Sequence, residues 1–433
     1  MLKKSLLFVS SLFFLTIFSC SSQKKDEQRI VIWTNNSEIV QYIELFNKTH
    51  STKAVLVYKE NPSSALEYEN ENFPDIVIAP YLKNHETRSN FDSLNYLFDR
   101  KYLIQKDFYS GLLKYGEILG NYYLLPVSFN LPTVIFSSDH AKFVKNDYTI
   151  STQDLFKIGQ EYNKRNSKNK LTQIGFSPLS SDKFLYFYTR INGAQFKESK
   201  RNLFSYNQKN LESIIENLVK MTVSGLNSVE EANDFVYKYL SVVDTKRVTG
   251  GRTLFAYTTS DNFFNLPSEQ ISKIDFRWVE QNGLISVEDS IVLMGISKNA
   301  SNYSGSLEFI SWFYNTETQR QFLELKNKLA SDLIKFGITG GFSSVKEVNE
   351  QILPLYYKSL LSNFPQEGSL KIPEAKPVKW EEIKESVIIP YIKEKILASE
   401  VQKQKDSDKI EIKMNPVRTI EERITQVNFT ELF

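Results

Sequence analysis

Polar side chains that could hold a small ligand follow the first predicted strand of the sequence. The apolar run Arg29-Ile-Val-Ile-Trp33 is typical of a strand buried on both faces, and four polar residues follow it: Asn35, Asn36, Ser37 and Glu38. Their amide, hydroxyl and carboxylate groups supply the hydrogen-bond donors and acceptors that a hydroxyl-rich ligand requires. Buried polar partners discriminate strongly, because a wrong ligand leaves them unpaired. These residue types indicate reversible binding of a polar molecule such as a sugar, with helix capping as an alternative role for Asn36 and Ser37.

The sequence lacks the motifs of the common hydrolases. It contains no Gly-x-Ser-x-Gly nucleophile motif and no His-Glu-x-x-His zinc motif. His50, His85 and His140 are isolated, and a single cysteine provides no Cys/His metal cluster. Carboxylate pairs are numerous, so counting alone leaves a glycosidase as the enzymatic alternative. We expect a binding protein without catalytic residues, cofactor or metal.

The elements that position these residues alternate between strand and helix patterns. Ile39, Ile43 and Phe46 fall on one face of a predicted helix, and strands are predicted at Lys53 to Tyr58 and at Phe73 to Ala79. This alternation favours an α/β fold with a mostly parallel sheet. Ligands bind beyond the carboxyl ends of the strands in such sheets, which is where the loop after the first strand lies.

The amino-acid composition is that of an ordinary globular protein, and the net charge gives no sign of a polyanionic partner. Apolar residues make up 41% and charged residues 24%, which is typical of a folded core, and 433 residues are enough for two lobes. The formal net charge is only +2, and nothing in it suggests nucleic acid or an anionic membrane surface as a partner. The 31 Phe and 23 Tyr serve mainly the core, but they also supply rings on which a sugar could stack.

The first 28 residues are typical of an export leader followed by a tether. Two lysines precede an apolar block, Ser5 to Phe18, which is short for a bilayer span. The sequence Ile17-Phe18-Ser19-Cys20 resembles the lipobox of bacterial lipoproteins, in which the thiol is acylated and the peptide is cut before the cysteine. We predict a signal peptide over 1–19, lipidation of Cys20, a tether over 20–28, and a lipid-anchored protein facing the periplasm or exterior. An ordinary signal peptide with an incidental cysteine is the alternative.

Seven segments, in order, resemble the solute-binding proteins of ABC importers, in the branch similar to maltose-binding protein. The segments are "RIVIWTNNSEIVQYIELFNKTH", "FPDIVIAP", "FYSGLLKYGEILGNYYLLPVSFNLPTVIFSSD", "INGAQF", "RTLFAYTTSD", "SIVLMGISKNASNYSGSLEFISWFYNTETQRQF" and "GGFSSVKEV". The resemblance implies a two-lobed periplasmic-binding-protein fold of type II, in which each lobe is a mostly parallel sheet flanked by helices and hinge strands join the lobes. It places lobe 1 at 29–131 plus 290–341, and lobe 2 at 132–289 plus 342–433, including the C-terminal helices.

The same resemblance implies a ligand cleft between the lobes and a set of residues facing it. Beyond the four residues of the first loop, the predicted set is Tyr81, Ser128, Phe129, Asn130, Tyr186, Thr259, Ser260, Asp261, Phe342 and Trp380. Trp380 has core packing as its alternative role. The implied partners are a small neutral solute, a sugar, and the transmembrane subunits of an ABC permease; the protein is expected to be a monomer that binds no nucleic acid.

Two other functions fit the same fold. A membrane-anchored sensor or adhesin could use it without transport, since a fold does not fix a function. A polyamine or another polar solute could replace the sugar, although a polyamine needs several carboxylates in the cleft, and only Glu38 and Asp261 are well placed in the sequence for that role.

Overall fold

The computed structural model describes residues 29–68, 72–144, 148–200, 203–223, 229–239, 241–329, 335–408 and 416–430. The predicted signal peptide, the tether and Cys20 lie outside the described residues. Among the helices of the described part, none combines the length and apolar character that a bilayer crossing requires.

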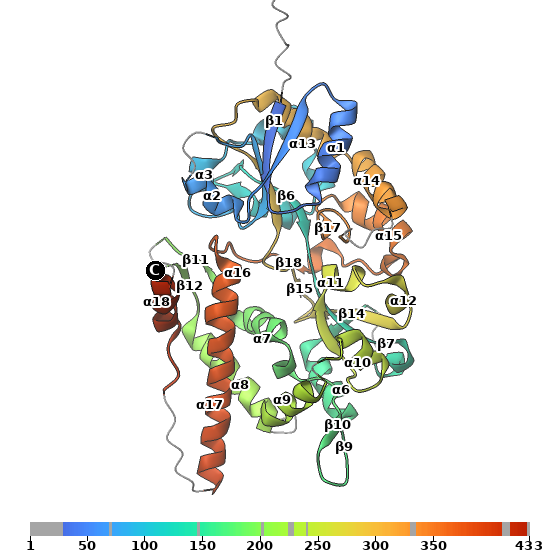
Figure 1. Ribbon diagram of the computed structural model, residues 1–433, viewed down its shortest axis with the longest axis vertical. Helices are drawn as coiled ribbons and strands as arrows, with labels where there is room; N and C mark the ends of the chain where they lie inside the picture. Colours follow the sequence, from blue (N-terminus) through green and yellow to red (C-terminus); the bar gives the residue numbers. More distant parts are fainter. Residues whose placement is uncertain are drawn as a thin grey trace, which may run out of the picture.

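The first lobe is built on a six-stranded sheet, at the top of Figure 1. Its strands, in spatial order, are β17 (Phe342–Ser343), β6 (Leu125–Phe129), β16 (Val292–Ile296), β3 (Ile76–Pro80), β1 (Arg29–Thr34) and β2 (Lys53–Tyr58). The predicted first strand is present, and its apolar residues Ile30, Ile32 and Trp33 are buried.

The prediction of mostly parallel sheets is only partly right. β1 pairs in parallel with both β2 and β3, but β16 runs antiparallel to β3 and β6, and β17 runs antiparallel to β6. The direction of β16 follows from topology: the chain returns from the second lobe and enters the sheet at the edge where β3 ends. The sheet of the second lobe also combines parallel and antiparallel pairs.

Helices cover the first sheet, and α1 (Ile39–Thr49) shows why they pack there. Its buried residues are Ile39, Tyr42, Ile43 and Phe46, which follow the spacing of one helical face. This face meets α13 (Tyr303–Phe313): the rings of Phe46 and Phe309 lie 5.1 Å apart, edge to face. The predicted helical face is therefore confirmed.

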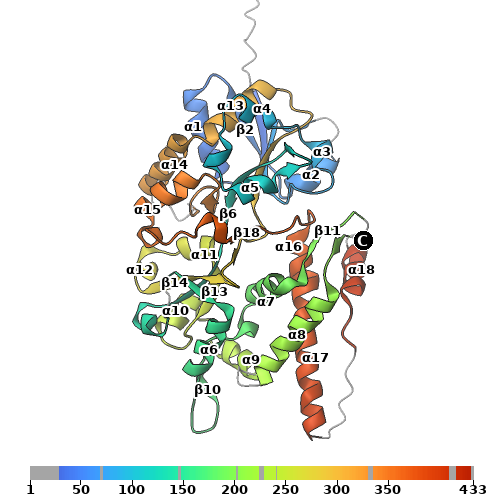
Figure 2. The ribbon, with the colours of Figure 1, turned by 180° about the vertical axis from the view of Figure 1, so that it is seen from behind.

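The second lobe is built on a four-stranded sheet in the order β13 (Ala256–Thr259), β7 (Pro132–Ser137), β14 (Ile274–Glu280) and β8 (Thr149–Ser151). β7 is antiparallel to both β13 and β14, and β14 is parallel to β8. Four helices stand out around it: α6 (Thr152–Tyr162), α7 (Asp182–Thr189), α8 (Gln208–Val223) and α17 (Ile389–Asp408). Figures 1 and 2 show α17 running beside α8 along one side of this lobe.

The chain crosses between the sheets from β6 to β7 and again from β14 to β16. A short parallel pair, β15 (Ile285–Ser286) with β18 (Leu370–Lys371), lies between the two lobes in Figure 1. After β18 the chain continues into α16 (Trp380–Ile383), at the end of the second lobe that faces the first.

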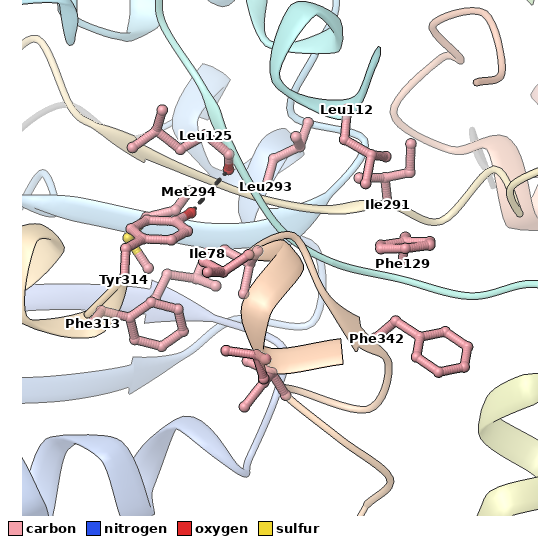
Figure 3. Close-up of a cluster of buried hydrophobic side chains, with 14 of the residues drawn as sticks. Ile78, Leu112, Leu125, Phe129, Ile291, Leu293, Met294, Phe313, Tyr314 and Phe342 are labelled. Atoms are coloured by element: carbon pink, nitrogen blue, oxygen red, sulfur yellow. Dashed lines mark hydrogen bonds between the residues drawn. The ribbon is translucent and has the colours of Figure 1, made fainter. Parts of the chain in front are cut away.

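An apolar core continues across the hinge. The cluster in Figure 3 includes Leu125, Tyr314 and Phe342, with the Tyr314 hydroxyl donating to the carbonyl of Leu125 over 3.3 Å. The Phe342 ring lies 5.8 Å from Phe129 of β6 and 5.8 Å from Trp278 of β14. Because β17 pairs with β6 in the first sheet, the predicted lobe boundary between residues 341 and 342 is wrong by at least this strand.

Candidate ligand-binding site

A cleft of about 590 Å³ lies where the loop after β3, the crossings, the helical turn after β13, α7 and α16 meet. Its walls come from Pro80, Tyr81, Asn130, Asp182, Lys183, Tyr186, Tyr257, Thr259, Asp261, Asn262, Glu288, Ser290, Glu381, Lys384, Glu385 and Ile389. Three tyrosines and many hydrogen-bonding groups therefore face one space between the two lobes. A pocket of this size and lining is suited to a small polar ligand with apolar faces.

The structure brings five of the predicted ligand residues together in this cleft: Tyr81, Asn130, Tyr186, Thr259 and Asp261. They come from four separate segments of the chain. Tyr81 follows β3 with φ of 59°, a left-handed conformation that turns the chain directly after the strand. Tyr186 lies on α7, and Thr259 ends β13 immediately before α11 (Ser260–Phe264), the short helix that carries Asp261.

Asn130 lies in the crossing from β6 to β7 and is held from two sides. Its Nδ2 donates to the carbonyl of Gly340 over 3.0 Å, and its Oδ1 accepts from the Ser260 hydroxyl over 2.7 Å. Ser260 is fully buried, and its oxygen also accepts from the backbone N–H of Leu131. Ser260 does not line the cleft; it fixes Asn130, which does.

A buried ionic cluster lies beneath the cleft and is centred on Asp289. The Asp289 carboxylate pairs with Arg190 over 3.1 Å and with Lys376 over 3.2 Å. It also accepts hydrogen bonds from the Tyr186 hydroxyl and from the indole N–H of Trp380, the latter over 3.2 Å. Burial opposes ionisation of Asp289, but Lys376 and Arg190 together hold its pKa well below its usual range. Tyr186, a wall of the cleft, is thereby tied to the strand crossing that carries Asp289.

Several residues of the cleft were not among those predicted, notably Tyr257, Glu288, Glu381 and Lys384. The Tyr257 hydroxyl donates to Glu288 over 3.4 Å, and Glu288 keeps 19% of its side chain exposed. Glu381 accepts from the Tyr81 hydroxyl and pairs with Lys384 over 2.5 Å. The available signal was the spacing of Glu381, Lys384 and Glu385 within one helical turn after Trp380, which places all three on one face.

The residues of the first loop do not line this cleft. Asn36 donates to the carbonyl of Thr339 over 2.8 Å, and Glu38 forms a buried ion pair with Lys326. Asn35 reaches the carbonyl of Glu60 over 3.5 Å, and Ser37 is exposed. Burial raises the pKa of Glu38, and Lys326 opposes that shift.

A tight loop that includes Gly337, Thr339 and Gly341 lies beside the first strand, where a ligand was predicted to bind. Thr339 also binds Ser128, with 2.7 Å between their hydroxyl oxygens, so Ser128 faces this loop as well. The loop needs glycine: Gly337 has φ of 58°, and a Cβ there would lie 2.0 Å from the carbonyl oxygen of Gly341. The expectation that Ser128 and the residues of the first loop line the cleft is therefore not met.

Three predicted aromatic contacts are part of the packed interior instead. Phe129, Phe342 and Trp380 are at most 1% exposed and do not line the cleft. Phe129 and Phe342 belong to the apolar core at the hinge. Trp380 packs against Phe204 and Phe196, at ring distances of 5.4 and 5.8 Å, so core packing describes it better than ligand contact.

Two further contacts join the lobes, one at the cleft and one beside a neighbouring groove. Tyr81, on the first lobe, donates to Glu381 on α16. His85 lies 2.7 Å through Nδ1 from Glu198 of β11 (Lys197–Glu198), and its backbone N–H donates to the same carboxylate oxygen over 2.9 Å. Both contacts form from the short segment that follows β3. The described residues contain no group of three His, Cys, Asp or Glu side chains placed to hold a metal ion.

Comparison of the sequence with protein-family models and with curated proteins finds no match. Solved structures match in fold. The ABC substrate-binding protein Lmo0181 from Listeria monocytogenes, in complex with cycloalternan, has a TM-score of 0.58 at 14% identity, covering 94% of this chain and 100% of that one. MalE from Xanthomonas citri, a sugar-binding protein, has a TM-score of 0.59 at 12% identity, with the same coverage of each chain.

A third match is the cyclic α-maltosyl-1,6-maltose-binding protein from Arthrobacter globiformis, with a TM-score of 0.57 at 14% identity over 86% of this chain and 94% of that chain. At such identities the likeness concerns the fold, and it extends over nearly the whole length of each protein. The chain therefore has the two-lobed α/β fold of MalE-like periplasmic binding proteins.

Proposed function

We propose that this protein is an extracytoplasmic solute-binding protein that captures a sugar between its lobes and delivers it to the permease of an ABC importer. The observation that carries the proposal is the cleft of about 590 Å³, whose walls combine tyrosine rings with hydroxyl, amide and carboxylate groups from both lobes. A sugar has an apolar C–H face and a rim of hydroxyls, so it needs rings and hydrogen-bonding groups in the same space.

The named ligands of the matching structures support this choice. The matching structures are a substrate-binding protein in complex with cycloalternan, the sugar-binding protein MalE and a cyclic α-maltosyl-1,6-maltose-binding protein. All three are named as binding proteins, which favours binding without catalysis here. In this proposal Cys20 carries the lipid that holds the protein at the membrane, and the mass of the N-terminal peptide of the mature chain tests that step.

A ligand panel tests the proposal on the full-length chain. Thermal unfolding is followed with neutral sugars, amino sugars, polyols, polyamines and anions. A ligand that binds only the folded state stabilises it by about 2.7 kcal/mol at a hundred times its dissociation constant. We expect such a shift with at least one sugar, which chromatography then recovers chemically unchanged. A chain that responds to no sugar, or that hydrolyses the sugar it binds, would contradict the proposal.

A further inference from the structure

The charges that face the cleft are unevenly distributed. Five carboxylates line it, Asp182, Asp261, Glu288, Glu381 and Glu385, against two lysines, Lys183 and Lys384. One lysine is already engaged, because Lys384 pairs with Glu381. On the side of the first lobe the walls are neutral: Pro80, Tyr81 and Asn130.

Two buried cationic side chains lie beneath the cleft and do not line it. Arg190 and Lys376 have side chains 8% and 1% exposed, and both pair with Asp289. Arg190 also reaches Glu288, but over 3.7 Å. The two cations beneath the cleft are thus shared with Asp289, and of the lining carboxylates Asp182 pairs with Lys393 over 2.9 Å. The lining still has more carboxylates than lysines, so the cleft presents a net negative charge to its ligand.

Asp261 and Glu288 act on each other across this wall. Burial raises the pKa of Glu288, Arg190 lowers it, and the neighbouring charges of Asp289 and Asp261 raise it again. Asp261 itself accepts a hydrogen bond from the Thr259 hydroxyl over 2.5 Å. A cation between these two carboxylates would relieve their repulsion and gain charge-assisted hydrogen bonds.

The cleft already accommodates one ammonium group of the protein itself. The Lys384 Nζ lies 5.4 Å from the centre of the Tyr186 ring, within the range of a cation–π interaction, and also contacts the Glu381 carboxylate. Tyrosine faces and carboxylates are thus combined here in a way that suits a primary ammonium group.

We infer that the ligand of this cleft carries a positive charge: a hydroxyl-rich molecule, such as an amino sugar, whose ammonium group binds at Asp261 and Glu288. The hydroxyl groups of the same ligand meet Asn130 and Ser290, and its ring lies against the tyrosines. The inference rests on the proposed function and narrows its ligand from any sugar to a cationic one, in contrast to the neutral solute expected from the sequence.

A matched pair of disaccharides tests the inference by calorimetric titration of the full-length chain. The glucosamine disaccharide has free amines, and the N-acetylglucosamine disaccharide has the same skeleton without charge. Cellobiose and spermidine complete the set. We expect the free-amine disaccharide to bind at least about tenfold more tightly than its acetylated partner, with a preference that weakens as salt is added.

Substitutions of single carboxylates test where the ammonium group of the ligand binds. Asp261→Asn and Glu288→Gln, made separately, should each reduce the preference for the amine about tenfold, because each removes one charged acceptor. Two variants are used so that a folding defect in one does not decide the result. Glu269→Gln, which removes an exposed carboxylate outside the cleft, should leave the preference unchanged.

The outcomes separate this inference from the proposed function. Equal or tighter binding of the neutral disaccharides would overturn the cationic ligand and leave sugar capture standing. Binding of spermidine without any sugar would keep the cation site and overturn sugar capture. Binding of none of the four ligands would count against both.

Discussion

Replacing Asp289 with asparagine should lower the free energy of unfolding by about 3–5 kcal/mol, because it leaves buried positive charge without its partner. Asp289 pairs with Arg190 and Lys376 and accepts from Tyr186 and Trp380. An amide of the same size keeps the shape but removes the charge that holds two buried cations. Urea unfolding of wild type and Asp289→Asn, followed by circular dichroism, measures the loss.

The pH dependence of this loss has a defined sign. The pKa of Asp289 in the folded protein lies below its ordinary value of 3.8, so its stabilisation is fully present above that value and is lost as the pH falls through the lower folded value. The gap between wild type and Asp289→Asn should therefore be constant near neutrality and shrink only in strong acid. Glu269→Gln serves as the control for loss of an exposed carboxylate. A loss below about 1 kcal/mol at neutral pH would mean that the charge of Asp289 contributes little to the stability of the fold.

Truncation of Trp380 to alanine should destabilise the fold by about 3–5 kcal/mol, because it empties the volume of a large ring from a packed core. The indole is fully buried against Phe204 and Phe196, and its N–H donates to Asp289. Thermal or urea unfolding measures the change.

Trp380→Phe separates packing from ligand contact. It keeps an aromatic ring and loses only the N–H bonds to Asp289 and Tyr186, so its destabilisation should be smaller than that of the alanine variant. Because Trp380 lies behind Tyr186 and does not line the cleft, sugar affinity of the folded Phe variant should match wild type. A large loss of sugar affinity with unchanged stability would show that Trp380 contacts the ligand, as the resemblance implied.

The strand and helix pattern made the α/β class predictable, and the resemblance to solute-binding proteins implied the two lobes. The buried run of β1 and the face of α1 that carries Ile39, Ile43 and Phe46 depend on local apolar spacing, which can be read directly from residue types. Strand direction is different, because it depends on where the chain re-enters a sheet. β16 looks like any other buried strand in sequence, yet it runs antiparallel because it returns from the other lobe.

The site was harder to predict, because its members are brought together by contacts between distant segments. Residues near the crossings and strand ends were found, as Asn130 and Asp261 show. The first loop was assigned to the ligand because nothing local indicates that Thr339, some 300 residues away, would cover it. Glu288 and Glu381 were missed because they become neighbours of the cleft only when the second crossing and α16 close around Tyr81 and Tyr186.

The central claim is that the two lobes close around a bound sugar, and a distance between the lobes tests it most directly. Ser89 on the first lobe and Lys200 on the second line the same groove beside the His85–Glu198 contact, so spin labels at Ser89→Cys and Lys200→Cys report opening. Cys20→Ala removes the only native thiol. A ligand that contacts both lobes binds the closed form better, so saturating sugar should shift the distance distribution to one short, narrow peak. Identical distributions with and without a sugar that demonstrably binds would contradict the account.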